Sequence, residues 1–200
     1  MKTNFENELP KSYREALHLD ATDKKFGIVM NVISLIVIAV VMTITIILMN
    51  IGGEISIDFT SPDIIIAYLV FMASMIAYII LHELVHGAAY KLLTKEKLTF
   101  GIRWSCAFCG VPNIYVYRSA AMIAVAAPLV LFTAVFLPLT VFLYGINHFY
   151  CLLSAFLLGM HLGGCSGDAY VLYLLTFRYN SRKTLIKDTG PEQFIYVHED

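Results

Sequence analysis

Two histidines and a glutamate lie close together within a long apolar stretch of the chain. His82 and His86 are four residues apart, and Glu83 directly follows the first histidine. In a helix four residues make about one turn, so both imidazoles lie on one face and can reach the same ion. Glu83 points about 100° away from His82, beside that ion. This arrangement suits a zinc-activated water: two neutral imidazoles bind the metal and the carboxylate handles the proton.

The surroundings of this H-E-x-x-H pattern strengthen the interpretation. Residues 63–93 are apolar and numerous enough to span a bilayer as a helix. Ionisable side chains inside such a span are costly and mark a functional site by default. The alternative is a buried histidine–glutamate pair, or a polar face that lines a helix contact. Hydrogen bonding alone requires neither both histidines nor this spacing, so we favour the metal site.

The composition indicates a membrane protein with several spans. Hydrophobic residues make up 58% of the 200 residues, whereas soluble domains average about 45–50% apolar residues. The net charge of −1 gives no reason to expect a nucleic acid as partner. We therefore expect the lipid bilayer as the surroundings of one compact helical bundle.

Four apolar segments, separated by polar connections, predict an all-α polytopic membrane protein. The fourth segment is longer than the roughly twenty residues that a bilayer requires, and the glycine-rich run at residues 163–168 interrupts it. A glycine-rich break at membrane depth is tolerated where it lines a cavity. We therefore expect a glycine-broken fourth helix. The predicted spans are residues 26–49, 63–93, 119–144 and 148–177.

The charged residues predict the orientation of the chain. All 14 Lys and Arg residues lie before the first span, in the long connection with its flanks, or after the fourth span. Positive residues are retained in the cytoplasm, so four spans with both termini cytoplasmic fit this distribution. The expected organisation, in a bacterial plasma membrane, is a cytoplasmic segment at 1–25, a membrane domain at 26–177 and a cytoplasmic tail at 178–200. Residues 6–17 have the weak periodicity of a short amphipathic surface helix.

The longest connection, residues 91–118, predicts a short cytoplasmic β-hairpin between the second and third spans. Residues 98–104 and 113–117 have strand character, and glycine and proline between them supply turn material. Such a hairpin can hold an extended substrate by backbone pairing along its edge. Alternatively, it only lies at the membrane interface, with its aromatic residues at headgroup level.

The cysteines do not resemble a secreted disulfide framework. Cys106 and Cys109 form a C-x-x-C, which is half of a zinc site or a redox pair. The other half is missing, because Cys151 and Cys165 lie in apolar segments. Reduced, packed thiols are the alternative, and the sequence leaves the role of this pair open.

A catalytic zinc requires three protein ligands and one open position, so another segment must supply the third ligand. The stretch from Ile64, the first apolar residue of the second span, to His82 is nearly as long as the stretch from His148 to Asp168. If both spans run inward, these side chains reach the same depth, near the cytoplasmic face. Asp168 is also the only acidic residue of the fourth segment, where an unpaired carboxylate is costly. We predict Asp168 as the third ligand.

Two alternatives to this assignment stay open. Asp168 can instead pair with Arg178, or cap the short helix that begins at Ala169. His161 competes as a ligand, although it lies seven residues earlier, or about 10 Å shallower on a straight helix. A hydrogen-bonded packing histidine is the more ordinary role for His161. Three further histidines are expected to be bystanders, at His18, His148 and His198.

The chain resembles the site-2 protease class of intramembrane zinc metalloproteases, and more closely a bacterial family of small membrane proteins described as zincin peptidases. Residues 82–87 match the zinc helix, residues 126–128 look like the small-residue and proline step of an intervening helix, and residues 166–168 lie where the site-2 class has its Asp-Gly motif. Glycines precede the aspartate here, alanine follows it, and no PDZ-like domain interrupts the chain. The resemblance implies zinc ligands at His82, His86 and Asp168, a catalytic acid/base at Glu83, and a strand-forming loop between the helices.

The sequence therefore predicts an integral-membrane zinc endopeptidase. Its substrate is expected to be a membrane-associated or membrane-spanning protein or peptide, cut near the cytoplasmic face. Glu83 takes the proton of a zinc-bound water and returns it to the leaving amine. One alternative is a non-proteolytic membrane protein that uses the same scaffold to bind a metal or a partner. Another is an assembly factor whose polar residues only hold helices together. The sequence does not indicate the oligomeric state.

Overall fold

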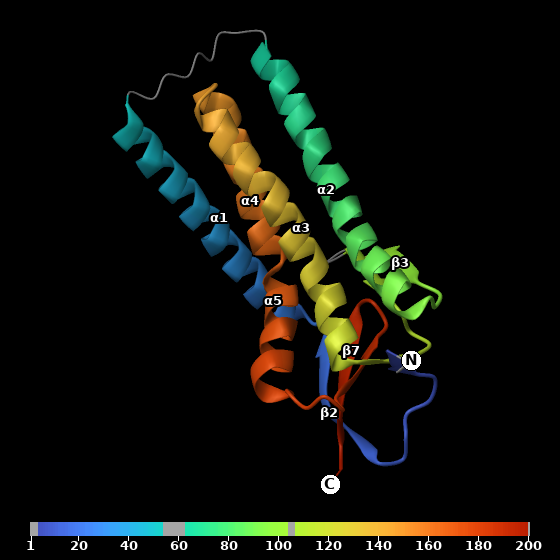
Figure 1. Cartoon of the computed structure of the whole chain (residues 1–200). Coiled ribbons are helices and arrows are strands. Elements are labelled where there is room, and N and C mark those ends of the chain that lie inside the picture. The colour runs from blue at the N-terminus through green and yellow to red at the C-terminus, as the bar shows by residue number, and fades with distance from the viewer. Residues whose placement is uncertain (1–3, 54–62, 104–106, 200) are drawn as a thin grey trace. The chain divides into compact units, whose positions relative to one another are not determined.

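The computed structural model describes residues 4–53, 63–103 and 107–199, and these residues are mostly helical (Figure 1). Four helical segments are long and apolar enough to cross a membrane, as the sequence predicts. A continuous helix satisfies its own backbone hydrogen bonds, which a lipid environment requires. The helices are α1 (Lys24–Gly52), α2 (Asp63–Thr94), α3 (Arg118–Tyr144), α4 (His148–Gly164) and α5 (Ser166–Tyr173), followed by a π-helical turn at Leu174–Arg178.

The fourth apolar segment is divided at Cys165, within the glycine-rich run, so that α4 ends and α5 begins there. At the other end of α4, the side chain of Asn147 accepts hydrogen bonds from two backbone N–H groups of the first turn, which is the usual way to cap a helix start. Gly163 allows a close approach of α1: a Cβ there would lie 2.6 Å from Ser34 Oγ and 2.8 Å from its carbonyl oxygen.

The chain folds as two compact units. The first, here called the sheet unit, consists of Met1–Val29, Ile80–Pro128 and Gly167–Asp200. The second, here called the helix unit, consists of Met30–Ile79 and Leu129–Ser166. His82, Glu83, His86 and Asp168 all belong to the sheet unit, whereas His161 belongs to the helix unit.

A five-stranded antiparallel sheet shows that the prediction of an all-α protein is wrong. The strand order is β1-β5-β6-β7-β2, so the two ends of the chain pair with each other. Figure 1 shows the blue strand β2 beside the red strand β7. The pairing extends from Tyr13↔His198 to Asp20↔Glu192. The strands are β1 (Phe5–Glu6), β2 (Tyr13–Asp20), β5 (Tyr115–Tyr117), β6 (Leu185–Asp188) and β7 (Glu192–His198).

The N-terminal segment therefore forms strands where a short surface helix was expected at residues 6–17. The weak helical periodicity of this segment does not decide its structure, because β7 supplies backbone hydrogen-bond partners and an apolar neighbour for an extended chain. Leu17 pairs with Ile195, and a register irregularity between Glu15 and Leu17 adjusts which side chains face inward.

A hairpin does lie between α2 and α3, but its strands differ from the predicted pair. Strand β3 (Thr99–Ile102) pairs with β4 (Ala107–Gly110). The other predicted segment, residues 113–117, contributes β5 to the five-stranded sheet instead. The reason is burial: Val116 is fully buried opposite Ile186, in the core of the sheet unit. The cytoplasmic location of the β3–β4 hairpin stays a prediction.

The core of the sheet unit joins the sheet to the small-residue face of α3. Ala120, Ala121 and Ala124 are all buried there, and their short side chains let neighbouring backbones approach closely. The sheet, the connection from β4 to β5, α5 and the π-helical turn after it supply larger apolar side chains. These are Val111, Ile114, Val116, Val171, Leu174, Leu175, Ile186 and Ile195.

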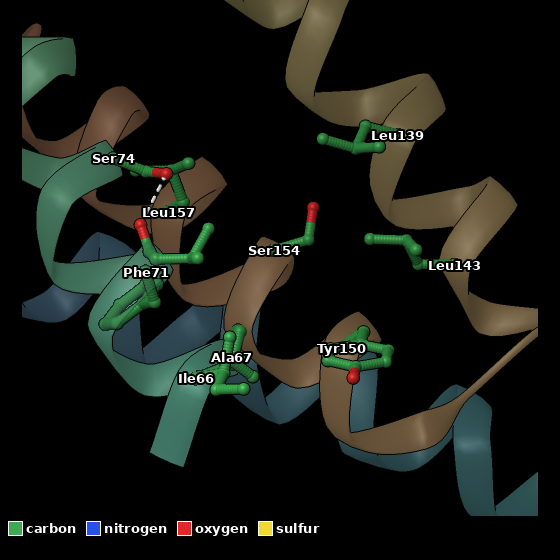
Figure 2. A pocket seen from close by; sticks show the side chains of 11 residues that line it. Ile66, Ala67, Phe71, Ser74, Leu139, Leu143, Tyr150, Ser154 and Leu157 are labelled. Atoms are coloured by element: carbon green, nitrogen blue, oxygen red, sulfur yellow. Dashed lines mark hydrogen bonds between the residues drawn. The ribbon is translucent and has the colours of Figure 1, made fainter. Parts of the chain in front are cut away.

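The helix unit contains an apolar pocket of about 420 Å³ among α2, α3 and α4 (Figure 2). None of its eleven lining residues is His, Cys, Asp or Glu. Two of its hydroxyls are bonded within the unit: Ser74 donates to the carbonyl of Val70 at 2.8 Å, and Ser154 lies 2.8 Å from the hydroxyl of Thr140. This pocket offers no metal ligand and no general base, so acid–base or metal chemistry requires other residues.

Burial raises the pKa of Asp188, in β6, to about 6. The folded protein therefore holds a proton that the unfolded chain has released between about pH 4 and pH 6, so this residue lowers the free energy of unfolding as pH rises. A rise in the pKa of Asp188 from its ordinary value to about 6 corresponds to a free energy on the order of 3 kcal/mol. The effect is complete above the folded-state pKa.

We expect Asp188→Asn to remove this part of the pH dependence. Thermal unfolding of chelator-treated protein in detergent, followed by circular dichroism from pH 4 to pH 7, measures it. The wild-type melting temperature should fall across this range relative to that of the variant. Parallel curves for the two proteins would contradict the expectation.

Candidate metal centre

The structure brings the three predicted ligands together within the sheet unit. His82 and His86 lie one turn apart on α2, with 3.2 Å between their Nε2 atoms. Asp168, near the start of α5, places Oδ2 3.3 Å from His82 Nε2 and Oδ1 3.4 Å from His86 Nε2. The two histidines are buried, and the side chain of Asp168 is 20% exposed. One ion could therefore contact all three side chains and remain accessible to water.

The distances among these donor atoms fit a tetrahedral zinc ion. Zinc binds imidazole nitrogen and carboxylate oxygen at about 2.0–2.2 Å, so two of its ligand atoms lie about 3.4 Å apart. The two histidine nitrogens are 3.2 Å apart, and each lies 3.3 or 3.4 Å from one carboxylate oxygen of Asp168, Oδ2 for His82 and Oδ1 for His86. Two histidines and one carboxylate are also a donor set of catalytic zinc sites, in which water takes the fourth position.

A contact with α3 orients the imidazole of His86. Its Nδ1 lies 2.9 Å from the carbonyl oxygen of Ala124. A carbonyl only accepts, so Nδ1 carries the hydrogen, and the neutral ring keeps a lone pair on Nε2, which faces His82 and Asp168. Histidine ligands of metals are typically held in this way. Sequence reasoning missed Ala124 because a backbone oxygen has no signature in the residue type.

The alternative partner of Asp168, Arg178, is placed differently. Its guanidinium lies over the ring of Tyr179, 5.6 Å from the ring centre. The carboxylate of Asp168 instead faces the two histidines. The first turn of α5 contains Asp168 as its acidic residue, so its charge is also favourable at this helix start.

His161 has the contacts of a packing histidine within the helix unit. It is fully buried. Its Nδ1 lies 2.9 Å from the hydroxyl of Tyr78, and its Nε2 lies 3.0 Å from the hydroxyl of Thr133 and 3.3 Å from the carbonyl oxygen of Leu129. Both ring nitrogens therefore have polar neighbours in the same unit, which favours the packing role over metal binding.

Glu83 lies beside the three donor atoms, on the side of α2 that faces the hairpin. Its carboxylate faces the backbone N–H of Cys109 in β4 and interacts electrostatically with His82, His86 and Asp168. The residue is half-buried. A carboxylate in this position can exchange a proton with a group held by the three ligands, as general acid–base chemistry requires.

Gly87 lets the hairpin approach this side of α2. A Cβ at residue 87 would lie 2.5 Å from the ring of Phe100 and 3.2 Å from the sulfur of Cys109. Because Gly87 follows Glu83 by one helical turn, β3 and β4 pack next to the carboxylate. The hairpin therefore forms a wall of the candidate site.

The thiol of Cys109 is not in the ionised form that redox chemistry requires. Burial, together with the charges of Asp188 and Glu83, raises its pKa to about 12, so it is protonated at neutral pH, whereas a reactive cysteine is a thiolate. Cys106, the other half of the C-x-x-C, lies outside the described residues. The role of this pair stays open.

Comparison with protein families agrees with this geometry. Residues 75–182, more than half of the chain, match the family described as "Putative zincin peptidase". The chain belongs to the zincin peptidase family. The matched region contains His82, Glu83, His86 and Asp168 together with the β3–β4 hairpin. No curated protein and no solved structure matches the chain. Membership of a zincin family implies a metallopeptidase and zinc, and the four apolar helical segments indicate a membrane protein.

Proposed function

We propose that the chain is an intramembrane zinc endopeptidase that hydrolyses a membrane-associated or membrane-spanning protein, as the site-2 class does. The observation that carries this proposal is the convergence of His82, His86 and Asp168, with Glu83 beside them, in helical segments apolar enough to cross a bilayer. A soluble zincin would have no need of such segments.

The position of the site along these segments supports cleavage near one membrane face. His82 and Asp168 each follow the start of their apolar segment, at Ile64 and His148 respectively, by a similar length of chain. At a helical rise of about 1.5 Å per residue this length is roughly 27–30 Å, close to the thickness of the hydrocarbon core. The distribution of Lys and Arg favours the cytoplasmic side for that face. Water then has a short path to the site.

Each of the four residues has a distinct role in the proposed reaction. His82, His86 and Asp168 would hold the ion, and the Ala124 carbonyl, by accepting the Nδ1 hydrogen of His86, leaves the Nε2 lone pair of that ring available for it. When bound, zinc supplies a Lewis acid and an activated water. Glu83 would accept the proton of the attacking water and pass it to the leaving nitrogen. One water is consumed, the peptide C–N bond breaks, and a carboxylate and an amine result.

The β3–β4 hairpin is the proposed support for the substrate. In its strand β4, the backbone N–H of Cys109 faces the carboxylate of Glu83. A substrate segment in extended conformation can form backbone hydrogen bonds with a strand edge. Such pairing requires local unwinding of a transmembrane substrate, which is easier near the membrane face than at its centre.

Two measurements test the proposal. Purified protein should contain one zinc per chain and lose it to a chelator. Fragments of membrane proteins should accumulate in cells that produce the wild-type chain and be missing from cells that produce Glu83→Gln. Zinc without fragments would support a binding role of the scaffold instead. Absence of zinc would favour an assembly factor in which the polar residues only hold helices together.

A further inference from the structure

Asp188 is a buried carboxylate that the proposed reaction does not use. It ends β6 and is 2% exposed. Its Oδ2 accepts hydrogen bonds from the hydroxyl of Tyr90 at 2.8 Å and from Nε2 of Gln193 at 3.3 Å, and its Oδ1 accepts one from the backbone N–H of Gly190 at 2.9 Å. Aspartate is rarely buried to this degree unless it is paired. Three donors fix the orientation of this carboxylate.

Tyr90 connects Asp188 to the helix that carries the metal ligands. It follows His86 by four residues, so it lies on the same face of α2 as His82 and His86. Its side chain is 1% exposed. The hydrogen bond to Asp188 therefore restrains the segment of α2 directly after the two histidines.

Asp188 also holds the strand next to Glu83. Its backbone oxygen accepts a hydrogen bond from the N–H of Val111 at 2.8 Å, directly after β4. The β6–β7 turn is in close backbone contact with the end of β4, since a Cβ at Gly110 would lie only 2.3 Å from the nitrogen of Gly190. Gly190 has a φ of +100°, which favours glycine at this turn.

We propose that Asp188 is a positioning residue for the metal site, fixing α2 through Tyr90 and β4 through Val111. Helix α2 and strand β4 meet where Glu83 faces Cys109. Their relative placement therefore determines where the carboxylate of Glu83 lies beside the three ligands. Asp188 contacts neither the substrate nor the ion. This inference rests on the proposed function, because it concerns the geometry of the same site.

The test compares three variants of the full chain, purified in detergent. Tyr90→Phe removes one oxygen, and Asp188→Asn removes the charge while the size is kept. Tyr117→Phe is the matched control, since it removes a similar tyrosine–carboxylate bond, 2.6 Å long, to Glu6 at the edge of the same sheet. Affinity for Zn²⁺ is measured by competition with a chromophoric chelator. The absorption spectrum of the Co²⁺-substituted protein reports the ligand geometry.

We expect Tyr90→Phe and Asp188→Asn each to weaken Zn²⁺ binding by about 10–100-fold, as outer residues of metal sites do, and to alter the Co²⁺ spectrum. Tyr117→Phe should change neither. Affinity within twofold of the wild type and an unchanged spectrum in Tyr90→Phe and Asp188→Asn would overturn the inference, although the proposed function would stand. An equal loss in Tyr117→Phe would also overturn it, because affinity would then follow general stability.

Two further outcomes are also decisive. A wild-type chain that binds neither Zn²⁺ nor Co²⁺ would overturn the proposed function, and the inference with it. If Asp188→Asn does not fold, Tyr90→Phe decides alone, because the loss of a single hydroxyl leaves the ring and its packing in place.

Discussion

Replacing Glu83 with glutamine is expected to stop cleavage while the chain still binds one zinc. Glutamine keeps the shape of the side chain and an oxygen that can face the N–H of Cys109, but it cannot accept the proton of a water molecule. General acid–base catalysis contributes roughly 10²–10⁴-fold to the rate, so the remaining activity should fall below detection in cells. Zinc should remain because Glu83 is not among the three converging side chains.

The measurement compares membrane-protein fragments, by mass spectrometry, between cells that produce the wild-type chain and cells that produce Glu83→Gln. Zinc content is determined on both purified proteins. Glu15→Gln, on the exposed face of β2, is the matched control and should behave as the wild type. Fragments that persist in Glu83→Gln would show that the protease interpretation is wrong. Loss of zinc in this variant would show that Glu83 is itself a ligand.

The second large effect is expected at Asp168. The substitution Asp168→Ala removes one of the three proposed ligands and leaves two imidazoles 3.2 Å apart without their carboxylate. Affinity for Zn²⁺ should therefore fall by more than the roughly 10–100-fold that outer residues contribute. Asp168→Asn should have a similar effect, since a neutral amide oxygen is a poor substitute for a carboxylate. Equilibrium dialysis and chelator competition on purified protein measure the loss.

The control for Asp168 is His161→Ala. It removes a fully buried imidazole, along with its contacts to Tyr78 and Thr133, but leaves His82, His86 and Asp168 in place. We expect lower thermal stability and an unchanged zinc content. Unchanged zinc in Asp168→Ala, together with reduced zinc in His161→Ala, would reverse the ligand assignment.

The helix with the H-E-x-x-H pattern could be predicted from the sequence because its geometry is local. The positions of His82, Glu83 and His86 on one turn follow from 3.6 residues per turn, whatever surrounds the helix. Asp168 could be anticipated because an acidic residue in an apolar segment requires a partner, and rise per residue placed it at the depth of the histidines. The structure brings these residues together, and the zinc experiment above tests their role.

The five-stranded sheet could not be predicted in the same way. Strand β2 pairs with β7 from the opposite end of the chain. Strand pairing depends on partners that are distant in sequence. Local periodicity therefore indicated a helix at residues 6–17, and the charged residues indicated a tail at residues 178–200. The same limit applies to residues 113–117, which had strand character but joined a different sheet.

The sequence by itself determined which side chains can bind a metal and accept a proton, because helical spacing and the cost of charge in lipid are properties of short segments. Only the tertiary structure decided what holds them. The carbonyl of Ala124 contacts His86, and Asp188 contacts Tyr90 across 98 residues. A backbone oxygen and an aspartate in a charged terminal segment have no distinguishing pattern, since their partners are chosen by how distant strands and helices pack.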